Sequence, residues 1–175
     1  MISEKIKSAV RDVPNFPKEG IIFKDITPIF QNPILRKEIT QSFCESVKNI
    51  DLDVIVGIES RGFLFGMLIA EELGLPFVPI RKKGKLPGDT YGVDYDLEYG
   101  KASIEIHKDA LKNGQKVLLH DDLLATGGTI NAAAELIKMS GADLLGFSFL
   151  IELKFLNGRA NLKRYSENII TLADY

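Results

Sequence analysis

The sequence of 175 residues contains a single cysteine, Cys44, and therefore cannot form a disulfide within the chain. A lone thiol in a helical pattern fits a reducing compartment and favours a buried or half-buried packing residue over a nucleophile. No apolar run approaches the about 18 residues that a membrane-spanning helix requires. Charged residues also enter the first six positions, which argues against a signal peptide. We therefore expect a soluble, cytoplasmic protein.

The sequence also has little net charge, because 22 basic and 24 acidic residues leave a balance of −2. Such a chain has no general positive field that would attract nucleic acid. It has no internal repeat, no linker and no biased structureless tract, and its 45% hydrophobic share supports a sizeable core. These observations predict one globular domain over residues 1–175.

Apolar periodicity predicts strands and helices in alternation. Helices are predicted near the N-terminus, after Asn32-Pro33, over about 62–73 and over about 129–139, and strands at 54–58, 77–80, 117–120 and 144–153. Two βαβ units in this order predict an α/β protein with a mainly parallel twisted sheet flanked by helices. Between the units, the alternating pattern within 84–106 predicts a flexible β-hairpin-like loop, mobile at 84–89. Ligands should bind at the carboxyl ends of the strands.

The most informative stretch of the sequence, 117–129, joins a predicted strand to a predicted helix through two acids and a glycine-rich turn. Gly127 and Gly128 allow the backbone to approach a ligand closely, and the N–H groups of the first helical turn then point at that ligand. The hydroxyl groups of Thr126 and Thr129 add further donors. The turn is therefore predicted to bind a phosphate monoester.

Two adjacent acids, Asp121 and Asp122, precede this turn. They would repel a phosphate that touched them, so we expect them to accept hydrogen bonds from sugar hydroxyls or to bind magnesium through water. Ribose 5-phosphate offers both kinds of group. An isolated acid pair or glycine pair is more typical of a polar loop with a helix cap, and it is the full stretch that favours a ligand site.

Two further stretches follow predicted strands and carry groups that bind anions. In 57–66 a strand end opens into a helix at Arg61, although this residue could equally pair with Glu59. In 80–88 four cations follow a strand, although such runs are usually solvated surface. Together with the phosphate turn, these stretches match a ligand with a monophosphate at one end and a pyrophosphate at the other. Phosphoribosyl pyrophosphate is such a ligand.

A proline-punctuated segment at 13–28 carries two aromatics outside any helical period, which predicts an extended lid. This lid, the three stretches above, the Leu97-Glu98-Tyr99-Gly100 turn and the tail at 152–159 resemble the adenine phosphoribosyltransferases, which are type I phosphoribosyltransferases. The resemblance covers about residues 11 to 163, in the family's order. The chain departs from the family pattern in three places: Glu19 stands where proline is frequent, Lys24 where some members have arginine, and His120 where an aliphatic residue is usual.

The resemblance implies a type I phosphoribosyltransferase fold and a role for each matching residue. Asp121 and Asp122 would bind the ribose hydroxyls, and the 5-phosphate would bind Ala125, Thr126, Gly127, Gly128 and Thr129. Pyrophosphate would bind the backbone of Glu59 and Ser60, joined by a non-proline cis peptide, together with Arg61, Arg81, Lys82 and Lys85. Arg81 is also a candidate for acting across a dimer interface.

For the base, the resemblance implies that adenine stacks between Phe23 and Leu123, is bound by backbone groups of Ile22 and lies near Lys24. Glu98 would be the catalytic acid/base residue facing the imidazole nitrogens of the base, and Tyr99 would close over the site. Structural roles stay open for Lys24 and Tyr99. The two histidines, His107 and His120, are expected to be structural or solvated residues without a part in catalysis.

The implied reaction is transfer of the 5-phosphoribosyl group from phosphoribosyl pyrophosphate to adenine, which gives AMP and pyrophosphate and serves purine salvage. Magnesium would be bound through phosphoribosyl pyrophosphate and water, with no direct protein ligand, and would stabilise the leaving group together with the cations. The sequence lacks a Ser-His-acid constellation, and this reaction needs no covalent nucleophile. We expect a homodimer that binds neither nucleic acid nor a membrane.

Two other functions stay open as alternatives. A phosphoribosyltransferase for 6-oxopurines would share the sugar-phosphate motifs and differ at the base. A regulator that senses phosphoribosyl pyrophosphate and binds nucleic acid would need a winged helix or a basic face, for which this chain has neither the length nor the charge.

Overall fold

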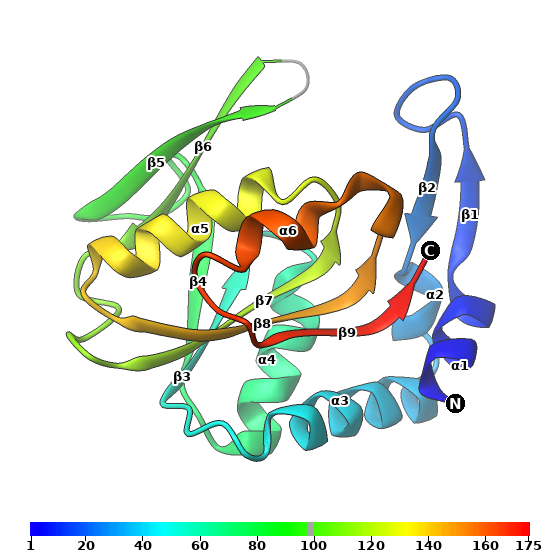
Figure 1. Ribbon diagram of the computed structural model, residues 1–175, viewed down its shortest axis with the longest axis horizontal. Helices are drawn as coiled ribbons and strands as arrows, with labels where there is room; N and C mark the ends of the chain where they lie inside the picture. Colours follow the sequence, from blue (N-terminus) through cyan, green and yellow to red (C-terminus); the bar gives the residue numbers. More distant parts are fainter. Residues whose placement is uncertain (98–99) are drawn as a thin grey trace.

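The computed structural model describes the backbone of residues 1–97 and 100–175 and the side chains of residues 1–95 and 101–175. Its centre is a twisted sheet of seven strands in the order β5-β6-β4-β3-β7-β8-β9, with helices on both faces (Figure 1). Its strands are β3 (Val54–Ile58), β4 (Phe77–Lys82), β5 (Thr90–Leu97), β6 (Gly100–His107), β7 (Lys116–Leu124), β8 (Asp143–Glu152) and β9 (Ile169–Asp174). A separate two-stranded sheet consists of β1 (Arg11–Pro14) and β2 (Ile22–Asp25).

The helices are α1 (Ile2–Ala9), α2 (Thr27–Phe30), α3 (Pro33–Val47), α4 (Gly62–Leu73), α5 (Gly128–Met139) and α6 (Gly158–Leu162), with a 3₁₀ turn at Lys154–Leu156. The strands from β4 through β3, β7 and β8 to β9 pair in parallel, whereas β6 pairs antiparallel with β4 and β5. This arrangement confirms the predicted α/β class with a mainly parallel sheet.

Local sequence signals place the ends of two helices. The side chain of Asn32 accepts a hydrogen bond from the backbone N–H of Leu35 at 3.0 Å, so Asn32 caps α3 as its position before Pro33 predicts. Gly74 ends α4 with a φ of 65°, a left-handed conformation that costs glycine little. Both boundaries follow from residues that lie within a few positions of the helix end.

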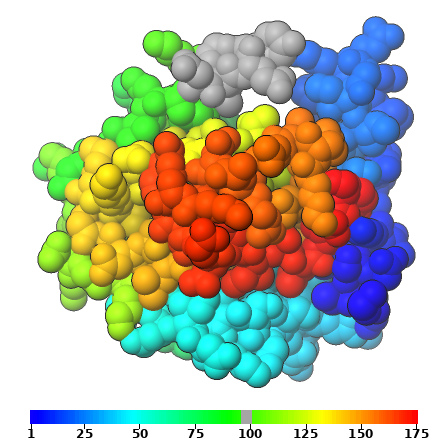
Figure 2. Space-filling model, viewed as in Figure 1, coloured from blue at the N-terminus to red at the C-terminus, as the bar shows by residue number. Residues whose placement is uncertain are grey.

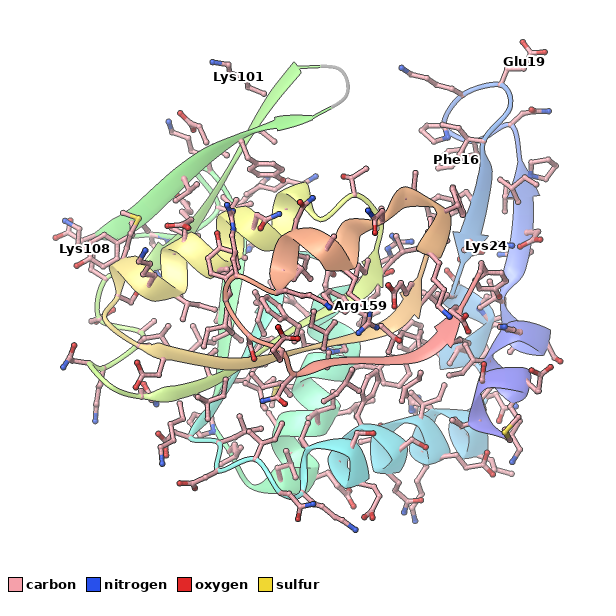
Figure 3. The ribbon with its side chains drawn as sticks, viewed as in Figure 1. Phe16, Glu19, Lys24, Lys101, Lys108 and Arg159 are labelled. Atoms are coloured by element: carbon pink, nitrogen blue, oxygen red, sulfur yellow. The ribbon has the colours of Figure 1, made fainter. Side chains whose placement is uncertain are left out.

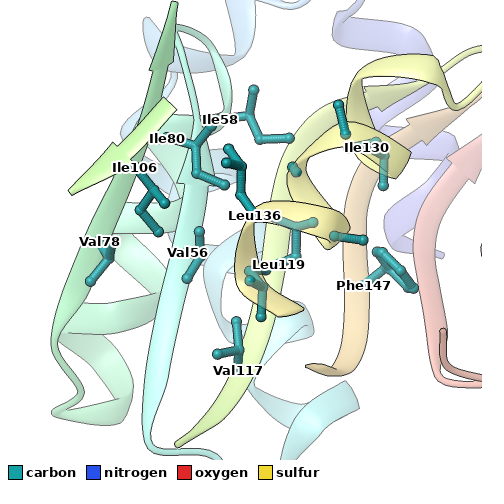
Figure 4. Close-up of a cluster of buried hydrophobic side chains, with 14 of the residues drawn as sticks. Val56, Ile58, Val78, Ile80, Ile106, Val117, Leu119, Ile130, Leu136 and Phe147 are labelled. Carbon is teal, nitrogen blue, oxygen red and sulfur yellow. The ribbon is translucent and has the colours of Figure 1, made fainter. Parts of the chain in front are cut away.

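The core has two parts, one on each face of the large sheet, because successive strand residues point to opposite faces. In β3, Val54, Val56 and Ile58 face α5, while Ile55 faces α3 and α4. Figure 4 shows the first part, where side chains of α5 pack on those of β3, β4, β6, β7 and β8. Burial on both faces explains why these strands are continuous apolar runs rather than alternating ones.

The structure adds to or corrects the sequence-based predictions in three places: the length of β7, the form of the N-terminal lid and three short elements. β7 does not end at His120 but continues to Leu124, because parallel pairing with β8 supplies backbone partners as far as Glu152. The predicted N-terminal lid is extended, and it forms an antiparallel hairpin in which Val13 pairs with Phe23. The sequence patterns did not indicate β9, α2 or α6, which are short.

Cys44 is half-buried on α3, as expected of a packing residue, and burial raises the pKa of its thiol. None of the helices in the described part of the chain is both long and apolar enough to cross a membrane.

His120 lies fully buried on the face of β7 that packs against α3 and α4. Its Nδ1 atom lies 2.8 Å from the hydroxyl oxygen of Ser148, and the ring of Phe43 meets it edge-on with centroids 5.2 Å apart. Burial lowers the pKa of His120 to about 3 from 6.5, with the hydrogen bond to Ser148 opposing the shift. The imidazole is therefore neutral at physiological pH and packs as part of the core.

This buried imidazole predicts a loss of stability in mild acid. Between pH 7 and pH 5 the unfolded chain takes up a proton at His120 that the folded chain does not, so the free energy of unfolding should fall by about 2 kcal/mol. Urea unfolding of the wild type and of His120→Leu at pH 7, 6 and 5 measures this contribution as the difference between their pH slopes. Equal slopes in the two proteins would contradict it.

Candidate active site

The stretches that the sequence analysis singled out meet at one edge of the large sheet, because the carboxyl ends of its parallel strands lie side by side there. β3, β4, β7 and β8 all end at this edge, and α4 and α5 begin there. The β1-β2 and β5-β6 hairpins stand on opposite sides of it (Figure 1). Figure 3 shows Phe16 near the turn of the first hairpin and Lys101 near the turn of the second.

The acid pair lies on β7 itself, not in the loop that follows it. Asp122 is only 4% exposed, and its backbone N–H donates to Oδ1 of Asp121 at 2.8 Å. Burial, and then the neighbouring charge of Asp122, raises the pKa of Asp121 well above its usual range. Burial also raises the pKa of Asp122, although Arg61 opposes the shift. The half-buried Asp121 and the buried Asp122 beside one cation form a site that favours hydrogen-bond donors.

Close approach of α4 to β7 helps to bury the acid pair. A Cβ atom on Gly62 would lie 2.8 Å from Oδ1 of Asp121 and 3.1 Å from its Cα. Only glycine therefore lets the first turn of α4 come this near to the strand. In that first turn the N–H groups of Phe63 and Leu64 donate to the carbonyls of Ser60 and Arg61, each at 3.2 Å.

Arg61 contacts two parts of the site at once. Its Nε lies 3.0 Å from Oδ2 of Asp122 as an ion pair, but the alignment is not that of a hydrogen bond, so this buried oxygen keeps its acceptor capacity. The guanidinium carbon also lies 5.0 Å over the ring of Phe23. Arg61 does not take Glu59 as its partner, which was the simpler interpretation of the sequence.

Glu59 pairs instead with the basic stretch that follows β4. Its Oε2 accepts from Nε of Arg81 at 3.1 Å and from the backbone N–H of Lys82 at 3.0 Å. Burial raises the pKa of Glu59, and the hydrogen bonds from Arg81 and Lys82 outweigh it and hold the pKa below its usual range. The Glu59-Ser60 peptide is cis, as the resemblance implied.

The basic stretch is shaped by contacts within the chain. Arg81 also donates to the carbonyl of Lys85 at 3.0 Å. Buried Glu105, for which the sequence analysis gave no role, accepts from the backbone N–H groups of Gly84 at 3.0 Å and Leu86 at 3.1 Å. The stretch is thus a defined turn, and the side chain of Arg81 bonds to Glu59 and Lys85 of its own chain.

The phosphate turn has the conformation that its glycines permit. Gly127 has a φ of 88° and precedes α5, and its carbonyl accepts from the backbone and side chain of Asn131 at 2.9 and 2.8 Å. The hydroxyl of Thr129 lies 3.3 Å from that of Tyr95 on β5. The turn therefore begins a helix with free N–H groups directed at the carboxyl edge of the sheet.

The tail after β8 supports this turn, which the sequence analysis did not foresee. A Cβ atom on Gly158 would overlap the carbonyl oxygen of Ala125. Arg159 donates to the buried carboxylate of Glu152 at 2.6 Å and to the carbonyl of Ile169 at 2.9 Å. The motif resemblance includes this tail. The packing shows in addition that Gly158 allows the tail to lie against the phosphate turn.

The residues expected at the base are separated by the alternation of β2. Phe23 faces Arg61 and meets Phe16 edge-on at 5.1 Å, while the backbone of Ile22 lies in the same strand, opposite Pro14. Lys24, on the other face, contacts Asp12 at 2.7 Å and the ring of Tyr175 at 4.0 Å. Glu98 and Tyr99 lie outside the described residues.

The described side chains thus offer an acid pair, two anion sites and an aromatic face within one edge of the sheet. No group of three or more His, Cys, Asp and Glu side chains among them is placed to hold a metal ion. A magnesium ion would fit here only with one or two carboxylates and ligand phosphates as its partners, which is a common mode for this ion.

The chain is similar to known proteins in both sequence and structure. The family described as phosphoribosyl transferase domain matches residues 25–167. An adenine phosphoribosyltransferase of Cytophaga hutchinsonii is 48% identical over 100% of this chain and 97% of its own, and one of Flavobacterium johnsoniae is 51% identical over 92% and 95%. A crystal structure of the Thermoanaerobacter pseudethanolicus enzyme superposes with a TM-score of 0.95 at 46% identity and covers 100% of both chains. The Saccharomyces cerevisiae enzyme, complexed with an imino-altritol bisphosphate and adenine, gives 0.91 at 44% identity and covers 98% of both chains.

The contact between Gly158 and Ala125 predicts that Gly158→Ala weakens binding at the phosphate turn. The added methyl group displaces the backbone of Ala125, so affinity for ribose 5-phosphate should fall by about tenfold to a hundredfold. Isothermal titration calorimetry measures this change. Gly92→Ala is the matched control, because a Cβ there meets only the carbonyl oxygen of Ile104 at 3.9 Å. Equal affinities of the two variants would contradict the role of Gly158.

Proposed function

The chain belongs to the adenine phosphoribosyltransferases, within the phosphoribosyl transferase domain family, and on this premise we propose that it transfers the 5-phosphoribosyl group from phosphoribosyl pyrophosphate to adenine. The products are AMP and pyrophosphate, and the reaction serves purine salvage. The observation that carries the proposal is the acid pair on β7, half-buried Asp121 and buried Asp122, beside the glycine-rich turn that opens α5. A sugar phosphate has hydroxyl donors for the acids and an anion for the turn.

We assign the sugar phosphate to these two elements. Ribose hydroxyls donate to Asp121 and Asp122, where the Oδ2 atom of Asp122 is buried without a hydrogen-bond donor among the described residues. The 5-phosphate binds in the turn, to the backbone of Ala125, Gly127 and Gly128 and the hydroxyls of Thr126 and Thr129.

Pyrophosphate is assigned to the carboxyl ends of β3 and β4. The backbone at the cis Glu59-Ser60 peptide and the cations Arg61, Arg81, Lys82 and Lys85 supply donors and positive charge. As the bond to the anomeric carbon breaks, negative charge grows on pyrophosphate, and these groups stabilise it. A role for Arg81 across a dimer interface would require it to leave Glu59 and the carbonyl of Lys85.

We place adenine between Phe23 and Leu123, with Ile22 contacting its edge, and we keep Glu98 as the acid/base residue and Tyr99 as the residue that closes over the site. The Arg61 guanidinium lies over one face of the Phe23 ring. Stacking of adenine on that face requires Arg61 to turn away, and pyrophosphate is the anion that we place within its reach. In this way the cation that stabilises the leaving group also clears the face for the base.

The acid pair and the phosphates of the substrate together form an oxygen-rich donor set that fits magnesium. When bound, the ion would supply positive charge to the leaving pyrophosphate. Asp121 and Asp122 are the residues that would face it through water.

We also propose a cytoplasmic homodimer. α4 exposes Leu64 and Met67, at 46% and 50%, on one helix face beside the pyrophosphate site. Apolar side chains grouped in this way favour association with a second copy. The half-buried Cys44 needs no oxidising environment.

The acid pair gives one prediction about substrate binding. Asp121→Ala and Asp122→Ala should each lose about 1.5–3 kcal/mol of binding to phosphoribosyl pyrophosphate, because each removes an acceptor for a ribose hydroxyl. Calorimetry measures the affinity, and Asp143→Ala, an exposed acid at the opposite end of β8, is the control. Unchanged affinity in both active-site variants would refute the assignment of the ribose.

Base selectivity tests the proposed function against the 6-oxopurine alternative. Pro14 lies opposite Ile22 and has no N–H, so the carbonyl of Ile22 receives no hydrogen bond from it and can accept one from the amino group of adenine. Hypoxanthine presents an acceptor at that position, and a mismatch of this kind can discriminate by up to about 10⁴ to 10⁵.

The experiment measures kcat/KM for adenine, hypoxanthine and guanine with magnesium present, and AMP formation with and without magnesium. Adenine should be preferred, and Ile22→Val should keep that preference because the backbone makes the contact. Phe23→Ala should weaken adenine binding through lost stacking. If kcat/KM for hypoxanthine or guanine is comparable to that for adenine, the assignment of adenine as the substrate is wrong and the 6-oxopurine alternative takes its place.

A further inference from the structure

The β1-β2 hairpin needs contacts that fix its position, because it forms a sheet of its own and, among the described strands, pairs with none of the large sheet. It nevertheless carries Phe23, whose ring faces Arg61 in the site. Where Phe23 lies relative to the acid pair therefore depends on side-chain contacts between the hairpin and the rest of the protein. Lys24, the next residue along β2, makes such a contact on the opposite face.

Lys24 is unusually buried for a lysine, with 13% of its side chain exposed. Its Nζ lies 2.7 Å from Oδ1 of Asp12, which is its direct cross-strand partner in β1, and 4.0 Å from the centroid of the Tyr175 ring. A buried ammonium group is costly without such partners. The carboxylate and the aromatic face together stabilise it in one place.

The ring of Tyr175 is held by the large sheet. Its backbone N–H donates to the carbonyl of Glu152 at 2.9 Å, and its carbonyl accepts from Lys154 at 2.9 Å, so the residue is fixed at the end of β8. The ring also packs against the core between the sheet, α1 and α3. Figure 2 shows the C-terminal segment in contact with the N-terminal part of the chain, and Figure 1 shows the C-terminus beside β2.

From this geometry we infer that Tyr175 is a positioning residue for adenine. Its ring fixes Lys24, Lys24 fixes β2, and β2 sets where Phe23 presents its face to the base. The inference rests on the proposed function and extends it: Lys24 acts through the position of the hairpin and does not touch the base itself. The alternation of β2, which puts Phe23 and Lys24 on opposite faces, supports this assignment.

The first test compares Tyr175→Leu with Tyr175→Phe in steady-state kinetics. Tyr175→Leu should raise KM for adenine by about tenfold, because the cation–π contact is lost, and should leave kcat and KM for phosphoribosyl pyrophosphate within about twofold of the wild type. Tyr175→Phe keeps the ring and should behave as the wild type does. Equal changes in both KM values, or a Tyr175→Phe variant as impaired as Tyr175→Leu, would overturn the inference.

Two lysines on the same ring provide a matched pair. Lys24 lies 4.0 Å from the Tyr175 ring and belongs to the hairpin, whereas Lys7 lies 5.7 Å from it and belongs to α1. Lys24→Met should reproduce the rise in KM for adenine, Lys7→Met should not, and combining Lys24→Met with Tyr175→Leu should add little. If Lys24→Met weakens adenine binding while Tyr175→Leu does not, Lys24 acts on the base directly and the inference is wrong.

Hydrogen–deuterium exchange on the ligand-free protein tests the contact without relying on activity. Tyr175→Leu and Lys24→Met should speed exchange in residues 11–25 by about tenfold and leave β7 unchanged, while Lys7→Met should match the wild type. Unchanged exchange in the hairpin would overturn the inference even if AMP is formed. Absence of AMP formation by the wild type would refute the proposed function, and the exchange result would still decide the role of the Tyr175 contact.

Discussion

Parallel pairing of β7 with β8 beyond the apolar core is the interaction on which the site depends. Through the pairs of Asp121 with Phe149 and Leu123 with Ile151, the strand stays paired with β8 where it carries both acids, and the backbone N–H of Asp122 donates to the side chain of Asp121. An acid on a paired strand has a fixed position, whereas one in a loop would be free to turn toward solvent. The same pairing sets where β7 ends, and hence where the glycine-rich turn and α5 begin. The direction of the helix N–H groups and the positions of the acids therefore share one structural cause.

Half-buried Asp121 and buried Asp122 place two carboxyl groups side by side, and their negative charge explains the position of Arg61. Desolvation raises the pKa of both acids, and Arg61 is the cation that lies against Asp122. Without substrate, the guanidinium stabilises the acid pair and covers the Phe23 ring. A ligand with hydroxyl groups would donate hydrogen bonds to the acids, and its anion would pair with the guanidinium. These contacts would replace the Arg61–Asp122 ion pair, which leaves Oδ2 of Asp122 without a hydrogen bond. In the proposed assignment, sugar, pyrophosphate and base would thus affect one another through the side chain of Arg61.

Local sequence signals predicted those parts of the fold that depend on neighbouring residues. Asn32 and Gly74 mark helix ends because caps and left-handed turns are decided within a few positions. The extension of β7 past His120 was missed, since pairing with a strand about 28 residues away decides it. The motif resemblance named Asp121, Arg61 and Phe23 together, but not the contact of Arg61 with Phe23 or the support that Gly158 gives to Ala125. Those contacts arise between segments far apart in the sequence, and no local pattern carries them.

The elements of the site differ in how they are held. The acid pair lies on β7, which is paired within the large sheet, and the phosphate turn opens α5, which is packed on that sheet through the core. Phe23 belongs to a hairpin that is tied to the body of the protein by side chains, and Glu98 lies outside the described residues. A rigid site for the sugar phosphate suits the phosphoribosyl group, which is the part of the substrate that all phosphoribosyl transfer reactions share. Base recognition on attached hairpins can change through residues such as Lys24 and Tyr175 without moving Asp121 or Gly127, because the contacts of the hairpin lie on its other face.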